Sequence, residues 1–452
     1  MTPSVLTGRR LSRRRFLRAG AGALAAAAVP ASRAAVPEAN GRTWRVDGRR
    51  LGRRLADLSR FGANPAGGVS RVAFSPADVA GRAFALDMMR AAGLEARVDP
   101  VGNILGRRPG LVPSALPIVF GSHIDSVPEG GNYDGDVGSM SAVEVAEVLA
   151  ENGYRNRHPL EVAIWCDEES GLTGSRGFVG DLTPDELARP GRDGVALAEE
   201  IRRIGGDAAR LGEARHDKGS VAAYLELHIE QGGTLEAAGV PIGVVEGIVG
   251  IHHYDVTVRG FANHAGTTPM DRRANALLAA SEIVLAVDRI VRSVPGRQVG
   301  TVGRLVVHPG APNVIPGEVD FTVELRDLRT ETIESLWSRI EPEARAIAER
   351  QGCGMEYVRR PPDRPALSDP RIRDLIASVA DDLGLRHLSL PSGAGHDAQE
   401  LAHIAPMGMI FIPSVGGISH SPKEYSRPQD VENGANVLLQ AVLRLDQGAL
   451  AE

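Results

Sequence analysis

The stretch Gly121–Gly138, GSHIDSVPEGGNYDGDVG, constrains the fold more than any other part of this chain. It follows an apolar run over 117–120, bounded by a proline and a glycine, that is typical of a buried strand. His123 therefore stands at the carboxyl end of a strand, where open α/β sheets bind ligands. Asp125 is expected to accept the second imidazole N–H of His123. We predict that His123 and Asp134 bind a metal; the alternative is an ordinary strand-end histidine beside a turn aspartate.

A pair of glutamates follows a second apolar strand. This strand, over 160–166, runs directly into Asp167, Glu168 and Glu169. Adjacent side chains of an extended segment point to opposite sides, but a turn at the strand end lets both glutamates reach one site. One of them can then bind a metal while its neighbour stays free as a general base. The alternative is a pair of solvated surface acids.

The order of the expected elements predicts the fold class. Up to residue 250 strands alternate with helices, which indicates a mostly parallel sheet with helices on its faces. Beyond Gly250 the order becomes β-α-β-β-α-β, the pattern of a split-βαβ unit. We therefore predict an α/β protein whose main domain, over residues 45–250 and 361–452, is a three-layer αβα domain. A ferredoxin-like domain over residues 251–360 is inserted into it.

The composition is that of an ordinary soluble protein, with 43% hydrophobic and 24% charged residues. A chain of 452 residues is long enough for two domains. The formal net charge of −6 argues against a nucleic-acid-binding protein. Two cysteines are too few for a disulfide framework or a thiolate zinc site.

Residues 1–34 are predicted to be an export signal. The run Ser12-Arg13-Arg14-Arg15-Phe16-Leu17 resembles a twin-arginine signal and precedes an alanine-rich apolar segment. That segment is shorter than the roughly 20 residues that a bilayer span needs, and small residues follow it for cleavage. We therefore expect a periplasmic or secreted protein with no membrane contact after signal removal. The alternative, a basic amphipathic surface helix, fits poorly because the apolar segment has no polar face.

Three more residues extend the expected metal centre. Like His123 and Asp134, they stand at strand ends or in adjacent loops: Glu169, His228 and His420. Nitrogen and carboxylate ligands without cysteine suit a catalytic zinc or manganese site. Three histidines and two carboxylates can hold two ions if one carboxylate bridges them. Asp134, on its tight turn, is the natural bridge.

Several motifs, which occur in one order from about residue 45 to the C-terminus, resemble those of a known enzyme family. They are GSHIDSV, YDG, the paired glutamates, LHIEQG, ANHAGTTPM, NVIPGEVDFTVELRD, SGAGHDAQ and PSVGGISHSPKEYS. Together they resemble the dinuclear-metal amidohydrolases that include N-carbamoyl-L-amino-acid hydrolase, allantoate amidohydrolase and β-ureidopropionase. That group belongs to the aminopeptidase-like metallohydrolase clan.

The resemblance implies two divalent metal ions per subunit, zinc first, with manganese, cobalt or nickel as alternatives. It implies two ligand sets that share one residue: His123, Asp134 and His228 in the first, and Asp134, Glu169 and His420 in the second. Glu168 matches the general base. Asp125 matches the residue that orients the first histidine.

The resemblance also implies a homodimer formed through residues 251–360, with substrate contacts from the same domain. Six residues, from the inserted domain and from the rest of the chain, match the substrate-binding positions of the family: Gln231, His264, Asn313, Arg326, Gly395 and His396. Arg326 suits bidentate capture of a substrate carboxylate; the alternative is a surface arginine paired with Asp327. His264 lies in a small polar loop and is expected to stabilise the oxyanion of the tetrahedral intermediate. The inserted domain is therefore expected to close over the metals.

Three departures from the family pattern are expected to affect the substrate pocket. The segment 170–173 is shorter than usual and lacks an Arg-Phe pair. Asp136 replaces a residue that is usually apolar, and either tunes the pocket or caps the following helix. His253, next to His252, is expected to face the substrate.

We predict a metal-dependent amidohydrolase that cleaves the ureido C–N bond of an N-carbamoyl-amino acid and releases ammonia. Its substrate is thus a small molecule with a carboxylate. Allantoate amidohydrolase is the first alternative, and an aminopeptidase or dipeptidase of the wider clan is the second. A metal-free binding protein is a further alternative, which the complete ligand set disfavours.

Overall fold

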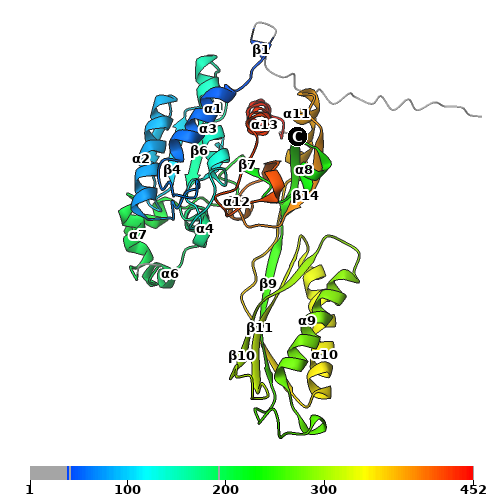
Figure 1. Ribbon diagram of the computed structural model, residues 1–452. Helices are drawn as coiled ribbons and strands as arrows, with labels where there is room; N and C mark the ends of the chain where they lie inside the picture. The colour runs from blue at the N-terminus through cyan, green and yellow to red at the C-terminus, as the bar shows by residue number, and fades with distance from the viewer. Residues whose placement is uncertain (1–37, 40–41, 192–193, 451–452) are drawn as a thin grey trace, which may run out of the picture. The chain divides into compact units, whose positions relative to one another are not determined.

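The structure is a computed structural model that describes residues 38–39, 42–191 and 194–450. These residues belong to one compact unit, residues 36–452 (Figure 1). The predicted export signal over residues 1–34 lies outside the described residues. Among the helices described, none is both long enough and apolar enough to cross a membrane.

A large sheet forms the centre of the catalytic region. Within the described residues it has nine strands in the order β13-β8-β15-β7-β5-β6-β4-β3, with β14 paired to β8. Strands β5, β6, β7 and β15 are parallel to one another and buried along their whole length, as expected for a sheet covered on both faces. The bounds are β3 Glu95–Val98, β4 Ile104–Arg108, β5 Ile118–His123, β6 Leu160–Trp165, β7 Ala223–Ile229, β8 Ile242–Ile248, β13 Ala366–Leu367, β14 His387–Ser392 and β15 Met407–Ile412.

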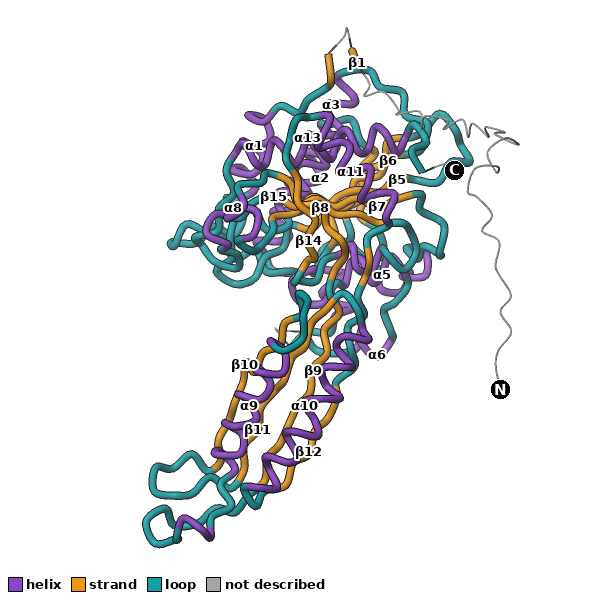
Figure 2. The backbone as a smooth tube through the Cα atoms, turned by 90° about the vertical axis from the view of Figure 1, so that its right-hand side faces the viewer, coloured by secondary structure: helices purple, strands orange, loops and turns teal. Residues whose placement is uncertain are grey.

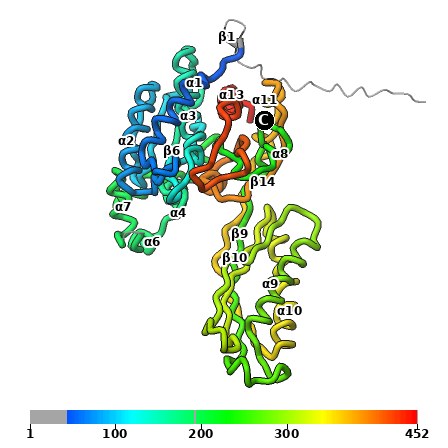
Figure 3. Tube along the Cα trace, viewed as in Figure 1, coloured from blue at the N-terminus to red at the C-terminus, as the bar shows by residue number. Residues whose placement is uncertain are grey.

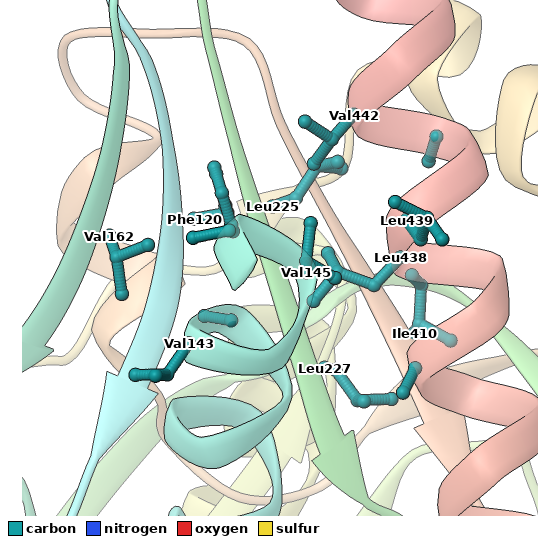
Figure 4. Close-up of a cluster of buried hydrophobic side chains, with 14 of the residues drawn as sticks. Phe120, Val143, Val145, Val162, Leu225, Leu227, Ile410, Leu438, Leu439 and Val442 are labelled. Carbon is teal, nitrogen blue, oxygen red and sulfur yellow. The ribbon is translucent and has the colours of Figure 1, made fainter. Parts of the chain in front are cut away.

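Helices cover both faces of the large sheet. On one face, apolar residues of β5 and β7 pack against α3 and α13, as Phe120, Leu225, Val145 and Leu438 show in Figure 4. The same core includes residues of α1 Gly48–Leu58, α2 Pro76–Ala91, α3 Asp136–Glu151, α11 Pro370–Asp382 and α13 Pro428–Asp446. The core of the other face includes residues of α5 Thr173–Val179, α8 Thr234–Ala238 and α12 Asp397–Leu401. The predicted three-layer αβα architecture is confirmed.

A second, smaller sheet carries the inserted unit, which we call the lobe. Its strands, all antiparallel, follow the order β10-β11-β9-β12, and α9 and α10 lie against one face (Figure 2). Buried and partly exposed residues alternate along β9 and β11, because the other face is solvated. The bounds are β9 Gly250–Arg259, α9 Ala276–Arg292, β10 Val299–His308, β11 Glu318–Asp327, α10 Thr330–Arg350 and β12 Gly354–Arg359. This order agrees with the expected split-βαβ unit.

The strand register defines two ends of the lobe. Gly250 of β9 pairs with Asp327 of β11 at the end next to β8, and Arg259 pairs with Glu318 at the other end. The chain enters and leaves the lobe at the first end, so the lobe is one continuous segment, green to yellow in Figure 3. Ten residues of strand at about 3.4 Å each separate the two ends by roughly 30 Å.

Some elements differ from the sequence-based expectation. Helix α3 begins at Asp136, directly after Gly135, which adopts a φ of 65° and ends the preceding turn. Strands β8 and β14 were not predicted. Strand β14 contains Pro391, which the sheet tolerates there because β14 pairs, among the strands that the structure describes, with β8 alone. The remaining described elements are short: β1 Glu38–Ala39, β2 Arg42–Thr43, α4 Glu168–Gly171, α6 Pro184–Ala188, α7 Leu197–Arg203, η1 Ala208–Glu213, η2 Met270–Arg272 and η3 Val415–Gly417.

Candidate metal centre

The five expected metal ligands lie together at one edge of the large sheet. Because β5, β6, β7 and β15 are parallel, their carboxyl ends meet at the same edge. His123 ends β5, Glu169 follows β6 in the one-turn helix α4, and His228 is the penultimate residue of β7. Asp134 lies in the loop before α3, and His420 in the loop after β15.

The two buried histidines present the same ring nitrogen to the centre. Nδ1 of His123 lies 3.0 Å from the carbonyl oxygen of Asp125, and Nδ1 of His228 lies 2.9 Å from that of Ile229. A carbonyl only accepts, so in both rings Nδ1 carries a proton and Nε2 is the nitrogen that faces the centre. Neither Nε2 is hydrogen-bonded to any residue that the structure describes, although both are buried. Two buried ring nitrogens without a hydrogen-bond partner fit a metal site, in which the ion takes the place of a proton on Nε2.

Asp134 lies between two groups of ligands. Its Oδ1 is 3.7 Å from Nε2 of His123 and 3.1 Å from Nε2 of His228. Its Oδ2 is 3.2 Å from Nε2 of His420, which is in turn 3.3 Å from Oε2 of Glu169. In each group the ligand atoms lie within 4.8 Å of one another. One carboxylate oxygen thus faces each group, which is the arrangement that a bridging ligand needs.

Electrostatics at this edge favour a cation. Burial alone would raise the pKa of Asp134, but the neighbouring imidazoles hold it well below its usual value. Burial alone would lower the pKa of His123, but Glu168, Asp134 and Asp125 hold it well above its usual value. The pKa of His420 is raised to about 9, first by its hydrogen bond with Asp134. The same concentration of carboxylates that favours protonated imidazoles attracts a divalent ion.

The paired glutamates lie on a turn, as expected, and Asp125 supports that turn. The carboxylate of Asp125 accepts the backbone N–H groups of Glu168 and Glu169, both at 3.2 Å. It lies 3.7 Å from Nδ1 of His123, so the expected hydrogen bond to the imidazole is made by its carbonyl instead. Burial raises the pKa of Glu168 well above its usual value and that of Glu169 to about 7. Oε2 of Glu168 lies 3.7 Å from Nε2 of His123.

Three residues near Asp134 complete this edge. Gln231, in the left-handed region with a φ of 56°, donates from Nε2 to Oδ2 of Asp134 at 2.7 Å. Glu424 accepts the backbone N–H of Asp134 at 3.0 Å, and the hydroxyl of Ser419 lies 3.2 Å from Oδ2 of Asp134. Gln231 is expected at this site from the sequence, whereas Ser419 and Glu424 are not. The signal that would have revealed them is their place within the motif that carries His420.

The loop before α12 brings two expected substrate residues to the same edge. The ring of His396 lies 4.4 Å from that of His228, and its Nε2 is 2.8 Å from the hydroxyl of Ser392. Burial lowers the pKa of His396 well below its usual value, so the ring is neutral. Gly395 is exposed beside it. A cavity of about 660 Å³ opens between Gln231 and this loop, lined further by Leu388, Leu390, Pro391, Ala394 and Arg297.

Arg326 and His253 lie at the end of the lobe nearest the large sheet. Both contact Glu324: Nε of Arg326 at 2.7 Å and Nε2 of His253 at 2.9 Å. Nη1 of Arg326 also donates to the carbonyl of Gly393 at 2.6 Å. The ion-pair partner of Arg326 is therefore Glu324 and not Asp327. Asp327 instead accepts the backbone N–H of Arg329.

His264 and Asn313 lie at the opposite end of the lobe. The two segments meet there, since the backbone N–H of Ala265 donates to the carbonyl of Asn313 at 3.0 Å. Both residues are exposed. Nδ1 of His264 accepts the N–H of Gly266 at 3.0 Å, so its Nε2 carries the proton. We call the edge of the large sheet that carries the five candidate ligands the metal edge. The structure does not bring His264 and Asn313 to the metal edge, because roughly 30 Å of strand lies between the two ends of the lobe.

Asp136 forms a buried ion pair. It accepts both of its hydrogen bonds from Nη2 of Arg71, at 2.7 and 2.6 Å, and both side chains are 1% exposed. Arg71 also donates to the carbonyl of Ile124, next to His123. Burial raises the pKa of Asp136 to about 6 against the opposing effect of Arg71. Asp136 therefore holds the loop after β5 against the start of α3 and does not line the pocket.

Comparisons with known proteins identify relatives along most of the chain. The profile of Peptidase family M20/M25/M40 matches residues 119–444. The chain belongs to this family. It is 40% identical over 408 residues to an N-carbamoyl-L-amino acid amidohydrolase of Geobacillus stearothermophilus, covering 89% of this chain and 100% of that one. It is 38% identical over 418 residues to a ureidoglycolate hydrolase of Arabidopsis thaliana, covering 88% and 87%.

A solved structure shares the fold over most of the chain. It is an amidase of the hydantoinase/carbamoylase family from Burkholderia multivorans, with a TM-score of 0.83 and 38% sequence identity. The match covers 89% of this chain and 98% of the other. The chain is therefore similar, along nearly its whole length, to hydrolases of carbon–nitrogen bonds.

Proposed function

We propose that this protein is an N-carbamoyl-L-amino-acid amidohydrolase, which hydrolyses the ureido C–N bond of its substrate to an amino acid, ammonia and carbon dioxide. The observation that carries this proposal is the 40% identity to the Geobacillus stearothermophilus enzyme along the whole of that enzyme. The geometry supports it, because two groups of candidate ligands share Asp134 and Glu168, which belongs to neither group, stands beside them.

Two divalent ions would bind at the carboxyl edge of the large sheet. Zinc is the first choice, with manganese, cobalt or nickel as alternatives. The first ion would be held by His123, Asp134 and His228, and the second by Asp134, Glu169 and His420. When bound, such ions lower the pKa of a coordinated water and polarise a carbonyl group.

Glu168 would act as the general base. Burial raises the pKa of its carboxyl group well above the usual value, which makes it a stronger base than an exposed glutamate. It would accept a proton from the attacking water as the C–O bond forms. It would then return that proton to the leaving nitrogen as the C–N bond breaks, so the side chain ends the cycle as it began.

Substrate contacts would come from both parts of the molecule. A substrate carboxylate would displace Glu324 from Arg326 and bind the guanidinium with two hydrogen bonds. His253, Gln231, Gly395 and the neutral His396 would surround the ureido group and the amino-acid backbone. The cavity of about 660 Å³ beside Gln231 would receive the amino-acid side chain, against Leu388, Leu390 and Pro391.

A homodimer through residues 251–360 would bring His264 and Asn313 to a metal centre. Strand β10 is an edge of the small sheet, and its Val299 and Leu305 are exposed, as are Leu278 and Leu285 on α9. Such an edge and apolar face are typical of a surface that binds a second copy. The lobe would close over the metals of its own subunit or of its partner, and Nε2–H of His264 would stabilise the oxyanion.

The N-terminal twin-arginine motif supports export of this enzyme to the periplasm or beyond the cell. That route carries folded proteins, which suits an enzyme that binds its metals in the cytoplasm. Replacement of Arg13 and Arg14 by lysine would leave the protein in the cytoplasmic fraction. Export that persists in this variant would contradict the proposal.

Ammonia release from a panel of substrates tests the function. Purified, metal-loaded protein is assayed with N-carbamoyl-amino acids, allantoate and dipeptides. The proposal expects ammonia from N-carbamoyl-amino acids at the highest kcat/KM. Preference for allantoate would assign the protein to the allantoate amidohydrolases, and peptide cleavage without ammonia would assign it to the aminopeptidases or dipeptidases.

A further inference from the structure

Glu424 connects the two loops that carry Asp134 and His420. Its side chain is buried, with 4% of the residue exposed. Oε1 accepts hydrogen bonds from the backbone N–H groups of Tyr133 and Asp134, at 2.9 and 3.0 Å. Oε2 accepts the hydroxyl of Ser419 at 2.8 Å, and Ser419 directly precedes His420. One carboxylate thus fixes both loops at the point where they approach each other.

The hydroxyl of Ser419 has one proton and two carboxylates within reach. Oε2 of Glu424 is 2.8 Å away, and Oδ2 of Asp134 is 3.2 Å away. The hydroxyl oxygen also accepts a hydrogen bond from Nε2 of Gln231 at 3.3 Å. The shorter contact gives the Ser419 proton to Glu424. Oδ2 of Asp134 already accepts a hydrogen bond from Nε2 of Gln231 at 2.7 Å, and without the Ser419 proton it keeps its second lone pair for the group that contains His420.

We propose that Glu424 is a positioning residue for the second metal ion. It fixes the backbone of Asp134 and holds the Ser419 proton away from Oδ2 of Asp134. That oxygen therefore remains an acceptor for the ion bound by Glu169 and His420. The inference rests on the proposed two-ion centre and adds a residue that touches neither the metal nor the substrate.

The substitution Glu424→Gln keeps the shape of the side chain but reverses the direction of its hydrogen bond with the Ser419 hydroxyl. The amide oxygen must face the two backbone N–H groups, because the NH₂ group would oppose two donors there. The NH₂ group therefore faces Ser419 and donates to its hydroxyl oxygen. The Ser419 proton is then free to turn toward Oδ2 of Asp134, where it competes with the second ion.

Calorimetric titration of the metal-free protein with Zn²⁺, without substrate, measures this effect. The wild type is expected to show two binding steps, and His420→Ala identifies the second step by abolishing it. In Glu424→Gln the affinity of that second step is expected to fall about 10–100-fold, the usual effect of losing a residue that supports a ligand. The first step is expected to be unchanged. Glu424→Gln combined with Ser419→Ala is expected to recover the second step, because the competing proton is gone.

Asp446 provides a matched control. It is also a fully buried carboxylate held by one hydroxyl, that of Tyr154 at 2.7 Å, and two backbone N–H groups, those of Arg157 and His158 at 2.9 and 2.7 Å. These partners precede β6, at the end of the sheet opposite the metal edge. Asp446→Asn is therefore expected to lower the melting temperature while both binding steps remain as in the wild type.

Each other outcome overturns the inference. An unchanged second step in Glu424→Gln would show that the carboxylate is not needed for the second ion. A loss that Ser419→Ala does not recover, or an equal loss in Asp446→Asn, would show a general structural effect. If Glu424→Gln does not fold, the variant Ser419→Ala alone decides. A lower affinity of the second Zn²⁺ step in that variant would contradict the inference that the Ser419 hydroxyl donates to Glu424 and leaves Oδ2 of Asp134 available. A wild type that binds one ion would refute the proposed two-ion centre itself, and the inference with it.

Discussion

At the metal edge of the large sheet, the side chains of His123 and His228 are 1% exposed, and a backbone carbonyl fixes each ring. At the far end of the lobe, His264 is exposed, and within the described residues its ring hydrogen-bonds only to backbone N–H groups of its own loop, those of Gly266 and Thr267. The first environment holds ligand atoms in place before any metal arrives, which is what a metal site requires. The second leaves a donor free to meet a substrate after movement or assembly. The two regions thus divide the proposed work between a fixed set of metal ligands and an exposed hydrogen-bond donor that reaches them only after domain closure or dimer formation.

Glu168→Gln is expected to have the largest effect, a fall in kcat of about 10³-fold, because the amide cannot accept the proton of the attacking water. Ammonia release measures kcat, and elemental analysis measures bound metal, which is expected to stay at the wild-type level. Turnover that survives this substitution would show that the general base is not Glu168, and would contradict the assignment of proton transfer to the metal edge.

Asp136→Asn is expected to destabilise the metal-free protein by about 3 kcal/mol, because it leaves the guanidinium of Arg71 buried without a counter-charge. The matched substitution in the lobe is Asp255→Asn, which breaks the exposed pair with Arg360 and is expected to cost less than about 1 kcal/mol. Urea unfolding measures both. Equal costs would contradict the view that the metal edge is the rigidly held region.

His264→Ala is expected to lower kcat about 10²-fold, as the loss of one oxyanion donor does, with metal content and melting temperature unchanged. His308→Ala is the control, because His308 is also an exposed histidine at this end of the lobe. It is expected to behave as the wild type. Equal activity of the two variants would exclude His264 from catalysis.

Mixed dimers distinguish the two ways in which His264 can reach a metal centre. If the partner subunit supplies it, a mixture of Glu168→Gln and His264→Ala subunits contains sites with both native residues, and activity reappears. If the lobe closes on its own subunit, each site of a mixed dimer lacks one of the two residues and the mixture stays inactive. Size-exclusion chromatography with light scattering establishes whether a dimer forms at all.

Arg326→Lys is expected to have the smallest kinetic effect, a rise in KM of about tenfold with a smaller change in kcat, because lysine cannot form two parallel hydrogen bonds to a carboxylate. The control is Arg360→Lys, an exposed arginine of the lobe that pairs with Asp255. A fall in kcat without a change in KM would place Arg326 in the chemical step instead of substrate binding.

Local sequence patterns predicted the αβα architecture and the meeting of the ligands. Apolar runs that end in His123 or in the Glu168–Glu169 pair identify strand ends, and parallel strands bring their carboxyl ends to one edge. Patterns did not reveal β14, whose proline opposes a strand assignment. That strand depends on its pairing with β8, a segment far back along the chain that no short window contains.

The sequence by itself determined which residue types are available at the metal edge and the order in which the strands deliver them. Only the tertiary structure decided how each is held. The carbonyl of Asp125 orients His123, while its carboxylate supports the glutamate turn. Glu424 reaches back 290 residues to the backbone of Asp134, and β9 places His264 roughly 30 Å from the metal edge. The physical reason is that strand propensity and side-chain chemistry are local properties, whereas hydrogen-bond partners depend on how distant segments pack.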